Sequence, residues 1–119
     1  MIETKSRSEL ESMDRANRVV RTILSELRDL VRPGVSTGEL GALAERRLTE
    51  LGALPAFKGY PHPDGGPVFP AVICASVNDE IVHGIPSPGR ILREGDILSL
   101  DFGAVVDGLY GDAAITVPV

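Results

Sequence analysis

The chain has 119 residues, a length that fits one domain at most. Its net charge of -5 and its scattered Lys and Arg residues argue against nucleic acid as a direct partner. No apolar run reaches the roughly 18 residues of a membrane span, and the polar, charged N-terminus is not typical of a signal peptide. The single cysteine, Cys74, excludes an internal disulfide and fits the reducing cytoplasm.

Two amphipathic helices are predicted in the first half of the chain. Apolar residues recur at three- and four-residue spacing over 10–31, and Arg32-Pro33-Gly34 ends this first helix. A second helix begins at Ser36, because Ser36 and Glu39 have the spacing of a capping box. Gly52 is a plausible C-terminal stop for this helix.

The second half of the chain is predicted to contain strands. The segment from Ala53 to Pro70 is rich in Pro and Gly and is expected to be irregular, with His62 as a solvated loop residue. Four strands are expected after it, over Ala71–Val77, Glu80–His83, Ile97–Val106 and Leu109–Val117. Two helices followed by antiparallel strands predict an α+β fold with the helices on one face of the sheet.

The most informative feature is a pair of aspartates, Asp101 and Asp112, on either side of an Asp107-Gly108 hairpin signal. With a two-residue turn, Asp101 lies opposite Ala114 and Asp112 becomes its diagonal neighbour on the same face, roughly 7–8 Å away. Two carboxylates on a buried, apolar face repel each other and are costly to desolvate, and a divalent cation between them removes both penalties. We interpret the pair as half of a metal site; two turn or cap aspartates are the alternative.

Two further sets of residues can carry chemistry. His83 precedes Gly84, which lets backbone or ligand approach closely, but a lone histidine can also be a hydrogen-bonded structural residue. A small apolar pocket beside a metal would use the same residue types as ordinary core packing. The residues open to both interpretations are Phe57, Tyr60, Phe69 and Cys74.

Several motifs occur in an order that is specific to one family. After the opening helix come the segments 32–40 (Arg-Pro-Gly-Val-Ser-Thr-Gly-Glu-Leu), 74–86 (Cys-Ala-Ser-Val-Asn-Asp-Glu-Ile-Val-His-Gly-Ile-Pro) and 92–101 (Leu-Arg-Glu-Gly-Asp-Ile-Leu-Ser-Leu-Asp). With the two spaced aspartates, they resemble the N-terminal half of the type I, bacterial methionine aminopeptidases of the pita-bread metallopeptidase family. The resemblance covers essentially all 119 residues. It implies half of a pita-bread fold, with a metal-binding β-hairpin in the sheet.

The resemblance also implies an activity, the removal of the N-terminal methionine from nascent polypeptides. Two divalent metal ions (Co, Mn, Fe or Zn) would activate a water molecule for attack on the peptide bond. Asp101 would be a bidentate ligand of one ion, and Asp112 would bridge the two. His83 would hydrogen-bond the substrate and help to stabilise the tetrahedral intermediate.

Substrate and partners follow from the same resemblance. The expected partners are nascent polypeptide N-termini, with the ribosome as a place of encounter, and neither nucleic acid nor a membrane is expected as a direct partner. Asn78 matches a position near an accessory monovalent-cation site. The methionine side chain would enter a narrow apolar pocket lined by Phe57, Tyr60, Phe69 and Cys74.

The family completes its metal site with one His and two Glu from a second half. We therefore expect residues 1–119 to be the N-terminal half of a single catalytic domain whose C-terminal half is absent, and to be inactive as a peptidase alone. The stretch from Tyr60 to Phe69 also carries more Pro, Asp and Gly than the family's usual loop, which affects the width of the methionine pocket.

Two other functions compete with this one. The first is a non-catalytic pita-bread relative that acts as a binding or interaction module. Retention of His83, Asp101 and Asp112 together counts against it, because such relatives lose metal ligands. The second is a proline-specific aminopeptidase or a creatine-cleaving hydrolase. These enzymes share the aspartate hairpin but carry an extra N-terminal domain and a different sequence around the histidine.

Overall fold

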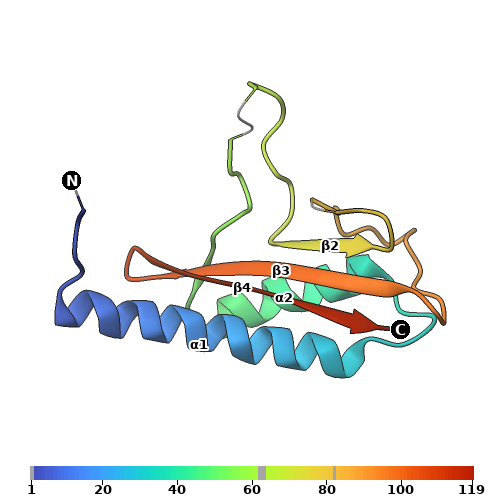
Figure 1. Ribbon diagram of the computed structural model, residues 1–119, viewed down its shortest axis with the longest axis horizontal. Coiled ribbons are helices and arrows are strands. Elements are labelled where there is room, and N and C mark those ends of the chain that lie inside the picture. The colour runs from blue at the N-terminus through green and yellow to red at the C-terminus, as the bar shows by residue number, and fades with distance from the viewer. Residues whose placement is uncertain (1, 62–63, 82) are drawn as a thin grey trace.

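Two helices lie against one face of an antiparallel sheet in the computed structural model, which describes residues 2–61, 64–81 and 83–119 (Figure 1). The predicted α+β architecture is thus confirmed. His62 lies outside the described residues, so its expected loop character is not addressed. The elements in chain order are α1 (Arg7–Leu30), α2 (Thr37–Glu50), β1 (Leu54–Pro55), β2 (Ile73–Val77), β3 (Ile97–Val106) and β4 (Leu109–Pro118).

The strand β3 is the centre of the sheet. Along one edge it pairs with β2 and then with the very short β1, and along the other edge it pairs with β4. The predicted hairpin register is confirmed, because Val106 faces Leu109 and Asp101 faces Ala114. Asp107 adopts a φ of 52° and Gly108 a φ of 76°. Both central residues of the turn therefore have the positive φ that a type I′ hairpin requires.

Both helices begin with a capping box. In α2 the Ser36 hydroxyl accepts the Glu39 N–H, as predicted, and the Glu39 carboxylate accepts the Ser36 N–H in return. The predicted stop is also confirmed, since Gly52 has a φ of 71° and its N–H donates to a carbonyl of the last helical turn. The helix α1 starts earlier than its apolar stripe suggests, because Ser6 forms a second capping box with Glu9.

The hydrophobic core lies between the helices and one face of the sheet. Alternate β3 residues point into it, and these are fully buried. The core is mostly aliphatic, with Phe102 as its largest fully buried side chain. Its principal members are Val20, Ile23 and Leu27 of α1, Leu40, Ala44 and Leu48 of α2, and Leu98, Leu100, Phe102 and Ala104 of β3.

Two expectations about strands were wrong. The described residues of the expected strand Glu80–His83 are not in a strand, and His83 has a left-handed φ of 62° that is incompatible with one; Val82 lies outside the described residues. The segment expected to be irregular from Ala53 contains β1, which pairs with Val105 and Ala104 of β3. Both differences arise from long-range pairing, which overrides the weak local preference of a few residues.

The connection between β1 and β2, over residues 56–61 and 64–72, projects from the sheet on the side away from α1 (Figure 1). Within it, Tyr60 and Phe69 form a ladder, in which the Phe69 N–H donates to the Tyr60 carbonyl at 3.1 Å and the Gly59 N–H donates to the Phe69 carbonyl at 2.8 Å. Neither helix, over the residues that the structure describes, is long and apolar enough to cross a membrane.

Candidate active site

The two aspartates lie on the face of the sheet opposite the helices, which we call the site face. Asp101 is in β3 and Asp112 is in β4, where it pairs directly with Gly103. Since residues two apart in a strand share a face, both carboxylates project from the same surface. This face is not the buried, apolar one that we expected: Asp101 is half-buried and Asp112 is exposed. The helices cover the other face with the core.

The electrostatics of the pair match the expected repulsion in direction. Burial raises the pKa of the Asp101 carboxyl above its ordinary value, and the negative charge of Asp112 and a hydrogen bond between the two side chains raise it further. The electrostatic interaction with His83 lowers the pKa of the same Asp101 carboxyl. The two aspartates and His83 are therefore close enough to act on one another electrostatically.

Cys74 lies beside the aspartates. It is in β2, directly opposite Asp101, and only 7% of it is exposed. Burial raises the pKa of its thiol to about 11, and the charge of Asp101 contributes to the rise. A hydrogen bond from the His83 backbone to the sulfur lowers the same pKa. The backbone at His83 thus reaches across the edge of β2 to the site face.

The aromatic residues predicted to line the methionine pocket do not all lie at the site face. Phe69 lies against His83, with ring centroids 6.4 Å apart and the planes tilted by 59°. The ring of Phe57 approaches Gly103, the direct partner of Asp112, so closely that a Cβ on Gly103 would be 3.1 Å from it. Tyr60, by contrast, is 64% exposed. The structure therefore brings Phe57 and Phe69 to the site face and leaves the Tyr60 ring largely in solvent.

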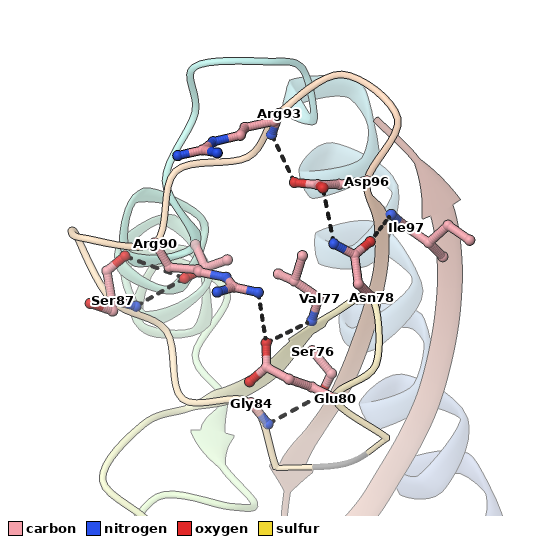
Figure 2. A network of polar contacts seen from close by, with 11 residues as sticks. Ser76, Val77, Asn78, Glu80, Gly84, Ser87, Arg90, Arg93, Asp96 and Ile97 are labelled. Atoms are coloured by element: carbon pink, nitrogen blue, oxygen red, sulfur yellow. Dashed lines mark hydrogen bonds and ion pairs between the residues drawn. The ribbon is translucent and has the colours of Figure 1, made fainter.

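Asn78 is engaged at the end of β2, away from the aspartate pair. Its Oδ1 accepts the Ile97 N–H at 3.0 Å and its Nδ2 donates to Asp96 at 3.0 Å (Figure 2). The Arg93 N–H donates to the same Asp96 carboxylate at 2.8 Å. The hydrogen bond from Asn78, followed by that from Arg93, holds the pKa of Asp96 below its ordinary value. This network closes the connection between β2 and β3, and a monovalent-cation role for Asn78 stays a prediction.

Sequence reasoning missed a contact that holds Asp112. The Asp112 N–H donates to Asn17 Oδ1 in α1 at 3.2 Å. The preceding residue, Gly111, allows this approach, since a Cβ there would lie 2.6 Å from the Asn17 nitrogen. Nothing local could have signalled the pair, because 95 residues separate Asn17 from Asp112. The helix α1 therefore fixes the strand at the position of the candidate ligand.

The chemical type of the side chains at this site suits a divalent cation. Two carboxylates on one face offer hard oxygen ligands, and a cation would relieve the repulsion that raises the pKa of Asp101. Within residues 2–61, 64–81 and 83–119, no group of three or more His, Cys, Asp or Glu side chains is arranged to hold a metal ion. The aspartate pair can thus supply part of a coordination shell.

The raised pKa of Cys74 predicts slow reaction with alkylating agents. The thiolate is the reactive form, and at neutral pH a thiol with a pKa of about 11 is almost entirely protonated. We expect iodoacetamide to modify folded Cys74 roughly 10- to 100-fold more slowly than a free cysteine of pKa about 8.5, because the higher nucleophilicity of a basic thiolate offsets part of the loss. Mass spectrometry of the time course measures this rate.

The matched control for this experiment is Asp101→Asn, which removes a negative charge that raises the Cys74 pKa. Alkylation of this variant should be faster than that of the unchanged protein. Equal rates for folded protein and free cysteine would contradict the assignment of a buried, protonated thiol.

Comparison with known proteins identifies the class. The sequence profile of metallopeptidase family M24 (Peptidase_M24) matches residues 11–119. In structure, the chain superposes on the methionine aminopeptidase of Thermotoga maritima with a TM-score of 0.91 and 43% identity, over 100% of this chain and 45% of that one. The X-Pro aminopeptidase of Thermotoga maritima matches with a TM-score of 0.74 at 20% identity, over 97% of this chain and 29% of that one, which is a likeness of fold alone.

The fold is therefore the pita-bread fold of these metallopeptidases. The chain belongs to metallopeptidase family M24. Methionine aminopeptidase 1 of Bacillus subtilis strain 168 is 47% identical over 119 residues, which are 100% of this chain and 45% of that protein. The predicted resemblance to the type I methionine aminopeptidases is confirmed, and the chain spans about half the length of these relatives.

Proposed function

We propose that this chain belongs to a metal-dependent aminopeptidase that removes the N-terminal methionine from nascent polypeptides. The observation that carries the proposal is the pair Asp101 and Asp112 on the face of the sheet opposite the helices, with His83 near enough to act on the Asp101 pKa. The identity of 47% with methionine aminopeptidase 1 of Bacillus subtilis supports the choice of substrate.

In this proposal Asp101 and Asp112 are the two metal ligands that the chain supplies. The carboxylates of Asp101 and Asp112 would hold the divalent ions. Bound divalent ions supply Lewis acidity and lower the pKa of a water molecule toward neutrality. Carboxylate ligands accept Co, Mn, Fe or Zn, so availability decides which metal is used.

His83 and the neighbouring aromatic residues would act on the substrate. The exposed His83 imidazole can donate a hydrogen bond to the oxygen that becomes negative as the peptide bond is attacked. Phe57, Phe69 and Cys74 form apolar surface beside it for the methionine side chain. Tyr60 would complete this pocket only after its exposed ring turns inward.

We further propose that residues 1–119 form one half of a catalytic domain. The carboxylate pair needs more ligands, and the relatives are about twice as long as this chain. The coding sequence downstream of Val119 tests this directly. A continuation with one His and two separated Glu is expected, and a stop codon immediately after Val119 would contradict it.

The proposal also places the protein in the cytoplasm, where nascent chains emerge from the ribosome. The free Cys74 thiol is compatible with that reducing compartment. A second candidate function, a non-catalytic binding module, would require no metal. Retention of both carboxylates and His83 on one face favours the enzyme over this module.

The activity is tested with the protein translated from its complete coding sequence. Release of methionine from a Met-Ala-Ser tripeptide should require added Co²⁺ or Mn²⁺ and should be abolished by a chelator. A matched Leu-Ala-Ser tripeptide should be cleaved much more slowly, since its branched side chain fits a narrow pocket poorly. Equal cleavage of both peptides would exclude methionine specificity, and activity that survives chelation would exclude the metal.

A further inference from the structure

The segment that carries His83 is docked on the outer edge of β2. Three successive β2 residues form hydrogen bonds with it. The His83 backbone hydrogen-bonds the Cys74 sulfur, the Ala75 N–H donates to the Gly84 carbonyl at 2.8 Å, and the Gly84 N–H donates to the Ser76 hydroxyl at 3.1 Å. The His83–Gly84 peptide is thus held by its own N–H, and the peptides before and after it are held on β2 as well.

Ser76 contributes its side-chain hydroxyl to these contacts, as the acceptor of the Gly84 N–H. It is only 4% exposed, and its hydroxyl faces Gly84 (Figure 2). A buried backbone N–H needs an acceptor, and here Ser76 Oγ is that acceptor. Gly84 also approaches so closely that a Cβ on it would lie 2.7 Å from the Ser76 Cα.

The contacts of this segment with β2 impose an uncommon backbone conformation on His83. His83 has a φ of 62°, which costs a non-glycine residue free energy and persists only where the surroundings impose it. The surroundings impose it from both ends. Before His83, the Glu80 carboxylate accepts the Val77 N–H at 3.1 Å and pairs with Arg90 at 3.5 Å (Figure 2). After it, the first anchor is Gly84.

We propose that Ser76 is a positioning residue for His83. The Ser76 hydroxyl fixes the His83–Gly84 peptide on β2 and thereby directs the imidazole toward the site face. The proposal rests on the proposed role of His83 in catalysis. Ser76 itself does not touch substrate in this scheme. Without its hydroxyl, the Gly84 N–H loses its partner, and the peptide can rotate so that His83 leaves Phe69.

The test compares Ser76→Ala, which removes the acceptor, with Ser76→Thr, which retains it. Ser99→Ala is the matched control, because Ser99 faces Ser76 across the strands and its hydroxyl pairs with Thr116 at 3.0 Å instead. In Ser76→Ala we expect the Gly84 amide to exchange at least tenfold faster and the nuclear Overhauser effect between the His83 and Phe69 rings to be lost. Ser76→Thr should restore both, and Ser99→Ala should change neither.

Kinetics in the complete protein give the second measurement. Ser76→Ala should lower kcat for methionine release about 10- to 100-fold with KM changed less than threefold, because a displaced transition-state donor affects the chemical step. If Ser76→Ala does not fold, Ser76→Cys, a near-isosteric weak acceptor, replaces it and should show intermediate values. Exchange and ring contact unchanged in the Ala or Cys variant would overturn the proposal. An inactive unchanged protein would overturn the proposed function alone, since the exchange and ring measurements do not depend on activity.

Discussion

Replacing Asp112 with Asn should lower kcat/KM for methionine release by at least about 10³-fold, given that changes to groups behind metal ligands already cost about 10–100-fold. An amide keeps the shape of the side chain but has one oxygen and no charge. It would therefore hold divalent cations more weakly than the carboxylate does. The measurement is steady-state hydrolysis of the methionyl tripeptide by the complete protein.

Stability separates this loss of activity from a loss of structure. The pKa of Asp101 is raised in the folded state, so Asp101 binds its proton more tightly there than in the unfolded chain. Its contribution to stability is therefore present below the unfolded pKa and is lost as the pH rises through the folded value. Asp112→Asn removes the repelling charge and should leave the metal-free protein at least as stable at neutral pH, with the difference disappearing in acid.

The matched control is Asp107→Asn, which makes the same chemical change at the turn of the same hairpin. Asp107 pairs with Arg15 at 2.6 Å on the exposed surface and has a positive φ that Asn tolerates. Activity should change less than threefold. Similar losses in both variants, or an Asp112→Asn protein with full activity, would contradict the proposed role of Asp112 as a metal ligand.

Replacing Gly84 with Ala should both destabilise the fold and displace His83. The added Cβ would collide with the Ala75 carbonyl oxygen and would lie 2.6 Å from the Ala75 carbonyl carbon. These are backbone atoms of the strand β2, so they cannot move aside as a flexible side chain can. We expect a loss of about 1–3 kcal/mol in the free energy of unfolding, as for other overpacked sites.

The same substitution should lower kcat about 10²-fold, since a displacement of about 1 Å in a catalytic group has an effect of that size. Gly89→Ala is the control, because it lies in the same connection and its Cβ would meet only the Ser87 hydroxyl, at 3.6 Å. Urea unfolding gives the stability. If Gly84→Ala and Gly89→Ala unfold within about 0.5 kcal/mol of each other, the close docking of Gly84 is wrong.

Much of the fold could be predicted because its signals are local. Ser36 and Glu39 are three residues apart, and the Asp107-Gly108 turn specifies its own strand register, which places Asp101 and Asp112 correctly. The early start of α1 also had a local signal, since Ser6 and Glu9 have the same capping spacing. It was overlooked because the apolar stripe begins later.

The parts that could not be predicted depend on distant contacts. The β-branched Ile81 suggested a strand, yet the docking of Gly84 on β2 forces His83 into a left-handed conformation. The contacts of Ser76 and Asn17 with the site segments have no counterpart in local spacing. The face of the aspartates, by contrast, did have a local signal: alternate β3 residues from Leu98 to Ala104 are apolar and mark the core face, which leaves Asp101 on the other face, so our placement of the aspartates on the buried side was wrong.

The central claim is that Asp101 and Asp112 hold a divalent cation together. Mn²⁺ titration of the ¹⁵N-labelled 119-residue chain, followed by paramagnetic broadening of amide signals, tests it most directly. Two carboxylates alone should bind weakly, with a dissociation constant of about 10⁻³ M or above. Broadening should centre on Cys74, Asp101 and Asp112 and should vanish in the Asp101→Asn/Asp112→Asn double variant. Broadening that spreads evenly over the surface carboxylates of α1, or that persists in the double variant, would contradict the claim.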